Sequence, residues 1–181
     1  MRSVAALLAA LLIVAAPRVC TAQRLVGAAT VEFVGTSTLH DFHGAAPPVP
    51  IAVDADGPGW QAAVAVPVAT LDTGTADRDE NMRAMFDAAH APEIRVVLSA
   101  VDAAALRRTH RLPFVLTIGA TSRDTTAAVE AWQEAGDQLA FDAVFPVSLR
   151  EFALQAPRAA LGLIRVGDAV QVTVHVSLRR A

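Results

Sequence analysis

The residues best suited to chemistry in this 181-residue chain lie close together near its amino end. His40, Asp41 and His43, within the segment T-L-H-D-F-H-G, carry the imidazole and carboxylate groups that commonly bind metal ions. In a strand, His40 and His43 point to opposite faces and share an ion only across a β-bulge. Asp41 and His43 share a face, but two ligands are too few for a zinc site without help from elsewhere. The alternative is that these side chains hydrogen-bond one another beside Gly44.

Motifs typical of other chemistry lack the structural context that they require. Gly35–Leu39 (G-T-S-T-L) has no second glycine for a nucleophile elbow, and a strand rather than a helix is predicted after it. Gly57–Ala62 (G-P-G-W-Q-A) matches a dinucleotide-binding pattern, but its glycines precede an alternating strand instead of a helix. The chain has no P-loop, no H-E-x-x-H and no calcium-loop motif. These motifs therefore assign the chain neither a nucleophile nor a cofactor.

Most of the chain alternates apolar and polar residues with the period of two that predicts half-buried strands. In the segment 168–179, for example, every second residue from Val170 to Leu178 is apolar. We predict strands near residues 28–35, 36–43, 49–55, 60–69, 93–101, 112–120, 124–132, 138–147 and 168–179. If the first two, and the pair around Thr121, are each one long bent strand, the count is about eight.

An antiparallel sheet with one apolar face removes its unpaired edges by closing into a barrel. Three prolines between Ala45 and Pro50, and D-G-P-G at residues 56–59, predict turns between the strands. A barrel of about eight strands is either filled by its own side chains or wide enough for one slender ligand. The small side chains of Ala62, Ala100 and Ala143, at inward positions, favour a pocket.

One segment has helical rather than strand spacing. Between Asp77 and Ala89, four residues fall on one face of a helix: Met82, Met85, Phe86 and Ala89. Asp77 followed by Glu80 resembles a capping box, and Pro92 ends any continuation. A solvated loop and a helix start also account for the whole acidic cluster of Asp72, Asp77, Asp79 and Glu80. The apolar face of this amphipathic helix covers an open end of the barrel or packs on its outer wall, and the pattern leaves both open.

The first residues read as a secretory signal peptide. Arg2 precedes an apolar run from Val4 to Ala16, so we predict a signal at residues 1–22 with cleavage before Gln23. The run is short for a membrane span, and a retained anchor helix is the alternative. Residues 23–181 then form a single exported domain without a cysteine and without stable membrane insertion. Whether two copies of it pair stays open.

The charge of the mature chain argues against nucleic-acid binding. Without Arg2 and Arg18 it keeps 13 arginines and no lysine against 18 acidic residues, a net charge of −5. No basic stripe remains that could follow a phosphate backbone.

Several segments resemble the YceI-like family of bacterial periplasmic polyisoprenoid- or lipid-binding proteins. The most specific is L-D-T-G-T-A-D-R-D-E-N-M-R-A-M-F-D, Leu71 to Asp87, followed by P-E-I at Pro92 to Ile94. Supporting segments are T-L-H-D-F-H-G, L-T-I at residues 116–118 and L-I-R-V-G-D-A-V-Q-V at residues 163–172. Two segments depart from the family pattern: Gly119–Asp124 follows L-T-I, and two histidines flank Asp41.

The resemblance implies a periplasmic, lipocalin-like, extended antiparallel β-barrel of eight strands that holds an apolar chain, with the short helix capping one end. Tail binding needs only burial of apolar surface, at about 25 cal/mol per Å². By parity and size, the expected ligand-binding residues are Phe33, Phe42, Trp60, Val64, Leu98, Phe114, Leu116, Phe141 and Phe145 on strands and Met82, Met85 and Phe86 on the helix.

Three hypotheses for function follow. The first, which we favour, is a periplasmic carrier or sequestration protein for an isoprenoid or acyl chain, and not an enzyme. The second is a metal-dependent enzyme centred on His40, Asp41 and His43. The third is a barrel with a solid core that binds a partner protein.

Overall fold

The structure, a computed structural model, describes residues 23–56, 59–156, 158–159 and 164–181. The predicted signal peptide, and residues 57–58 of the predicted D-G-P-G turn, lie outside the described residues. The described elements are, in chain order, β1 (Gln23–Ser37), β2 (Phe42–Asp56), β3 (Gly59–Pro67), η1 (Val68–Thr70), α1 (Ala76–Met85), β4 (Glu93–Asp102), α2 (Ala103–Thr109), β5 (Arg111–Ile118), β6 (Thr121–Ala135), β7 (Gln138–Ser148), η2 (Arg150–Phe152), β8 (Arg158–Ala159) and β9 (Ile164–Arg180).

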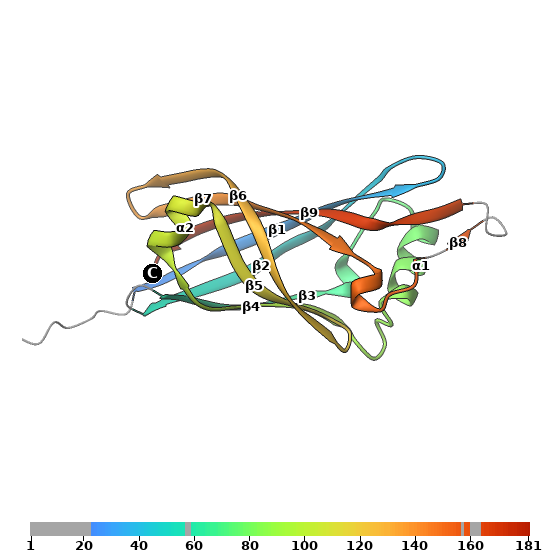
Figure 1. The fold of residues 1–181 in the computed structure, drawn as a ribbon, viewed down its shortest axis with the longest axis horizontal. Coiled ribbons are helices and arrows are strands. Elements are labelled where there is room, and N and C mark those ends of the chain that lie inside the picture. Colours follow the sequence, from blue (N-terminus) through green and yellow to red (C-terminus); the bar gives the residue numbers. More distant parts are fainter. Residues whose placement is uncertain (1–22, 57–58, 157, 160–163) are drawn as a thin grey trace, which may run out of the picture.

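Within the described residues, eight strands form a closed antiparallel barrel, which confirms the predicted fold class. The strand order is β1-β2-β3-β4-β5-β6-β7-β9, and pairing of β1 with β9 closes the sheet (Figure 1). The short strand β8 pairs with β9 outside this ring. Inward residues alternate with outward ones as predicted: in β5, Leu112, Phe114, Leu116 and Ile118 are all buried.

The amino-terminal hairpin corrects two predictions. No strand spans residues 36–43, because the Ser37 hydroxyl accepts hydrogen bonds from the backbone N–H groups of Leu39 and His40 and so ends β1 in a turn. The prolines between Ala45 and Pro50 do not form a turn but lie inside β2. Proline has no N–H to donate and is tolerated on sheet edges, and the part of β2 that carries the prolines pairs with β1 but not with β3.

The pairing of β2 with β3 is confined to one end of the barrel. Only Asp54, Ala55 and Asp56 pair with β3, at Gln61, Trp60 and Gly59. Farther along β2, the backbone of Ala45 exchanges two hydrogen bonds with Asp72, which lies between η1 and α1. The segment between η1 and α1 therefore contacts β2 near Ala45, where β2 does not pair with β3.

Two β-bulges change which side chains face inward. Ala100 in β4 and Ala131 in β6 have positive φ angles of 52° and 50°, and the strand pairing shifts register beside each. After the first bulge, Ala100 is exposed and Val101 is buried, so the prediction that Ala100 faces the interior was wrong. After the second bulge, Trp132 rather than Ala131 packs against the core.

The two helices lie at opposite ends of the barrel (Figure 1). Helix α1 was predicted at residues 77–89 but spans Ala76–Met85 and is followed by turns. Its N-cap is Thr75, so Asp77 lies in the first turn and the predicted capping box is wrong. Helix α2 was not predicted, although Asp102 caps it by accepting hydrogen bonds from the N–H groups of Ala104 and Ala105. Neither described helix has the length and apolar character needed to cross a membrane.

Candidate functional site

A cavity of about 360 Å³ occupies the end of the barrel next to α1. Its apolar wall comes from strands β1, β2, β3, β4, β5, β7 and β9, and from the segment that runs from residue 71 through α1. The apolar lining consists of Val31, Phe33, Phe42, Val66, Leu71, Met82, Met85, Phe86, Ile94, Val96, Leu116, Ile118, Phe145, Val147, Leu149, Val166, Val170, Val172 and Val174. The barrel interior is therefore not solid at this end.

The polar lining residues come from only two segments. They lie in the turn between β1 and β2 and in the stretch leading into α1: Ser37, His40, Thr73, Thr75, Asp77, Arg78 and Asn81. Four of them (His40, Thr75, Asp77 and Asn81) are exposed, so they form the rim of the cavity rather than its depth. The cavity thus has an apolar interior and a polar mouth, which suits a ligand that has one apolar and one polar end.

Two phenylalanines at the mouth lie over glycines of the facing strand. Gly35 pairs with Phe42 and Gly44 pairs with Phe33, and a Cβ atom on either glycine would collide with the facing ring. Each glycine therefore leaves the space that the ring occupies, and the rings are fixed against the backbone beside the cavity.

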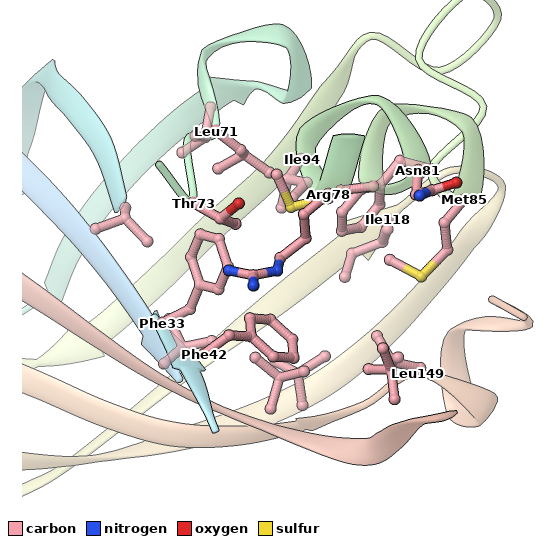
Figure 2. A pocket seen from close by; sticks show the side chains of 18 of the residues that line it. Phe33, Phe42, Leu71, Thr73, Arg78, Asn81, Met85, Ile94, Ile118 and Leu149 are labelled. Atoms are coloured by element: carbon pink, nitrogen blue, oxygen red, sulfur yellow. The ribbon is translucent and has the colours of Figure 1, made fainter. Parts of the chain in front are cut away.

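Arg78 extends from α1 into this mouth. Its guanidinium carbon lies 5.2 Å from the centre of the Phe42 ring, a cation–π distance, and the group points toward Phe33 and Phe42 (Figure 2). No ion pair joins this guanidinium to a carboxylate within the part of the chain that the structure describes. A cation at the mouth of an apolar cavity is available to a polar or anionic group of a ligand.

Asp79 fixes the stretch before α1 rather than serving as a free acid. This buried carboxylate accepts hydrogen bonds from the Thr73 hydroxyl at 2.7 Å and the Thr73 N–H at 2.9 Å. The hydroxyl hydrogen bond lowers the pKa of Asp79 below its usual value, because it stabilises the charged form. On the opposite side of the same helix start, the Asp72 carboxylate accepts from the N–H of Gly74. Much of the acidic cluster therefore shapes the wall of the cavity.

The apolar face of α1 closes this end of the barrel. Met82, Met85 and Phe86 all line the cavity, and Met82 packs in a second core cluster with Val66 and Leu71. Of the two placements that the sequence left open, the helix thus caps the end and does not pack on the outer wall.

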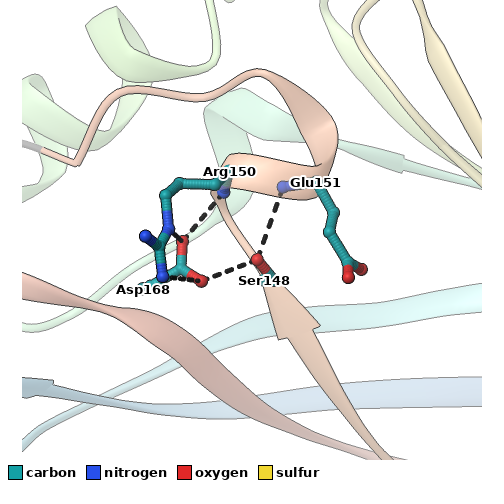
Figure 3. A network of polar contacts seen from close by, with 4 residues as sticks. All are labelled: Ser148, Arg150, Glu151 and Asp168. Atoms are coloured by element: carbon teal, nitrogen blue, oxygen red, sulfur yellow. Dashed lines mark hydrogen bonds and ion pairs between the residues drawn. The ribbon is translucent and has the colours of Figure 1, made fainter.

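A polar network holds the part of the wall around Leu149. The Asp168 carboxylate, at the start of β9, accepts hydrogen bonds from the Ser148 hydroxyl at 2.7 Å and the Arg150 N–H at 2.9 Å, and it pairs with the Arg150 guanidinium (Figure 3). The Leu149 N–H donates to the Asp168 backbone carbonyl. These contacts lower the pKa of Asp168 to about 2, with the Ser148 hydrogen bond the largest cause.

The predicted ligand-binding residues separate into two groups. Seven line the cavity: Phe33, Phe42, Met82, Met85, Phe86, Leu116 and Phe145. The other five lie outside its lining: Trp60, Val64, Leu98, Phe114 and Phe141. Trp60, Phe114 and Phe141 are buried in the core cluster, which Leu98 contacts, and Val64 is half-buried. Ligand binding itself stays a prediction for both groups.

Sequence reasoning missed the polar mouth and the β9 wall. Arg78, Asn81 and Thr73 lie in the segment that resembles the family signature, but parity and size select only apolar residues. Val170, Val172 and Val174 were read as one apolar strand face, and nothing in their pattern separates cavity positions from core positions.

The histidine-rich segment does not form a metal centre among the described residues, where no group of three His, Cys, Asp or Glu side chains could hold an ion. His40 lies in the turn before β2 and lines the rim, whereas Asp41 is exposed and His43 is exposed on β2. Beside His40, the Ser37 hydroxyl accepts hydrogen bonds from the N–H groups of Leu39 and His40 and donates one to the His40 carbonyl.

The fold and the cavity define a closed β-barrel with an internal apolar site. The family model of the YceI-like domain matches residues 25–178, so the chain belongs to the YceI-like family, as its sequence predicted. None of the curated proteins compared with the chain matches it.

Solved structures share the fold at low sequence identity. BcnA of Burkholderia cenocepacia is 21% identical, with a TM-score of 0.63 over 83% of this chain and 95% of its own. A polyisoprenoid-binding domain from Saccharophagus degradans, implicated in plant cell wall breakdown, is 13% identical, with a TM-score of 0.63 over 87% of this chain and 98% of its own. A mutant of the Campylobacter jejuni YCEI protein is 16% identical, with a TM-score of 0.56 over 76% and 84% of the two chains.

Proposed function

We propose that this protein binds a single-tailed lipid, either an isoprenoid or an acyl chain, and carries or sequesters it in the periplasm after export by residues 1–22. The tail lies in the cavity and the head group lies at the rim beside Arg78. The observation that carries the proposal is the composition of the lining, in which 19 residues are apolar and the polar ones are confined to the mouth.

Physical chemistry supports this assignment. A tail gains about 0.8 kcal/mol for each buried methylene, without any directed polar contact. The polar rim lets the head group keep water or protein partners, so it avoids the cost of burying an unpaired polar group. The relative from Saccharophagus degradans, described as a polyisoprenoid-binding domain, has the same fold. We favour a binding protein over an enzyme, because the two carboxylates that accept hydrogen bonds from hydroxyls, Asp79 from Thr73 and Asp168 from Ser148, also accept backbone N–H groups and so hold the chain in place.

The proposal is tested by identifying any lipid that stays bound to the protein during purification. Protein exported to the periplasm and purified without detergent is analysed by native mass spectrometry and by solvent extraction. We expect one lipid chain per bound protein. Repeated isolation without lipid, together with no uptake of added fatty acid or isoprenoid, would contradict the proposal.

A pair of variants on β9 links the lipid to the cavity. Val172→Phe places a ring inside the lining and should reduce the lipid-bound fraction. Gln171→Phe adds the same ring on the outer face of the same strand and should leave that fraction unchanged. Equal loss in both variants would place the lipid elsewhere.

A further inference from the structure

The interior of the barrel differs between its two ends. In the half next to α1 the inward side chains line the cavity, whereas in the half next to α2 they pack against one another. Along β7, Phe145 and Val147 line the cavity, but Ala143, Phe141 and Leu139 do not, although all five are buried. Along β7 the lining therefore ends between Phe145 and Ala143, and on β9 it extends to Val174, which pairs with Ala143.

An aromatic pair forms the floor at this point. The ring of Phe145 meets the ring of Phe114 edge to face, with centroids 5.0 Å apart and an interplanar angle of 68°. Phe114 is 7% exposed and is not part of the lining, whereas Leu116, the next inward residue of β5, does line the cavity. Phe114 is thus a side chain of the packed half that borders the cavity directly, through its contact with Phe145.

Behind the floor, stacked aromatic rings fill the barrel. The ring centre of Trp132 lies 5.4 Å from that of Phe141 and 6.4 Å from that of Trp60, with interplanar angles of 17° and 16°. The bulge at Ala131 places Trp132 on the inner face, and the guanidinium of Arg107 on α2 covers its ring at 5.9 Å. This half is stabilised by its own packing and does not need a ligand to fill it.

We propose that Phe114, held against Phe145, is a stop that limits how much of a lipid tail the barrel accepts. This inference rests on the proposed lipid-binding function. A cavity of about 360 Å³ lies near the small end of the range for ligand sites, about 300–1,000 Å³. The ligand class is a single-tailed lipid of short to medium length. A longer tail leaves its excess methylenes in water at the mouth, where they add nothing to affinity.

The test is a series of saturated fatty acids from caprylic to behenic acid, with dissociation constants measured by titration calorimetry. We expect each added methylene to tighten binding about fourfold until the tail reaches Phe114, after which affinity stays constant. In Phe114→Ala the loss of the ring extends the cavity. The tail length at which affinity stops rising, here called the break, should therefore increase. Phe141→Ala is the matched control, because Phe141 is similarly buried, at 6% exposed, but lies behind the floor, and its break should not move.

Folding of each variant is checked by circular dichroism and thermal unfolding, and Phe114→Leu serves as a milder change that should move the break by less. If the affinity of the wild type rises through the whole series of fatty acids, that result alone overturns the proposal that Phe114 limits tail length. A break that stays in place in a folded Phe114 variant, or that moves equally in Phe141→Ala, would also overturn it. These outcomes leave lipid binding intact, whereas the absence of binding at every tail length would contradict the proposed function instead.

Discussion

Arg78 shows how one side chain can give an apolar cavity a preferred ligand orientation. Its position over Phe42 keeps the charge at the mouth. The neighbouring carboxylate, Asp79, accepts two hydrogen bonds from Thr73 and forms no ion pair with the Arg78 guanidinium. A ligand with a carboxylate or phosphate head group can therefore place that group beside Arg78 while its tail lies inside.

The contribution of this charge is testable by comparing two ligands with the same tail. Arg78→Gln should weaken binding of palmitic acid about fivefold, the upper end for a partly exposed ion pair, and should leave binding of its methyl ester unchanged. Displacement of a fluorescent fatty acid measures both affinities. Arg83→Gln, on the same helix but outside the lining, should change neither. Equal weakening for acid and ester would mean that Arg78 acts by packing rather than by charge.

The residues of the site could be predicted from the sequence only in part. Phe33, Phe42 and Phe145 line the cavity as expected, but Phe114 and Trp60 fill the opposite half. Both groups lie at inward strand positions, so the alternation that identifies them cannot tell lining from core. That distinction depends on depth along the barrel, which register and bulges determine.

Among the elements, the 3-10 turn η2 depends most clearly on a single charge. Asp168 on β9 accepts hydrogen bonds from both Ser148 and Arg150, and so fixes the chain where β7 leaves the barrel and Leu149 enters the cavity wall. Since the pKa of Asp168 is lower in the folded state, its contribution to stability is present above the usual value of 3.8 and is lost as the pH falls through about 2.

Asp168→Asn should therefore lower the melting temperature at neutral pH. The difference from wild type should shrink below pH 3.8 and vanish as the pH falls through about 2. Thermal unfolding followed by circular dichroism across this range measures it. Asp54→Asn, which removes an exposed ion pair with Arg24, serves as the control and should have little effect at any pH. A pH-independent difference for Asp168→Asn would assign its role to packing.

Local signals predicted some elements well and others poorly. The helical spacing of Met82, Met85 and Phe86 identified α1, and period-two alternation identified the main strands. Helix α2 is only seven residues long, too short for a periodic apolar face, and Asp102 before three alanines was its available signal. The prolines of β2 were misread as a turn because nothing local shows that a strand lies on an unpaired edge.

At the scale of the whole molecule, pairing of β1 with β9 turns a sheet into a barrel. An outward-facing group links three strands across this closure: His175 of β9 contacts Asp142 of β7 at 2.8 Å and Glu32 of β1 at 3.7 Å. The hydrogen bond with Asp142 is the largest cause that raises the pKa of His175 above its usual value of 6.5. A raised folded-state pKa stabilises the fold below 6.5, and this stabilisation is lost as the pH rises through the raised value.

His175→Gln should accordingly lower the melting temperature more below pH 6.5 than well above it. The effect should be modest and weakened by salt, because the His175 side chain is 44% exposed. His43→Gln, at an exposed position on β2, serves as the matched histidine control. Greater destabilisation of His175→Gln at high pH than at low pH would contradict the assignment.

The seam between β2 and β3 has a kinetic consequence. Beside Ala45 the neighbour of β2 is not β3 but the segment before α1, joined to it in the described residues by the two backbone hydrogen bonds between Ala45 and Asp72. These two bonds lie outside the strand ladders of the ring, so this segment can move outward without breaking a ladder. Under the proposed lipid-binding function, we therefore expect a lipid to exchange on a timescale far shorter than global unfolding, through the opening of one short connection.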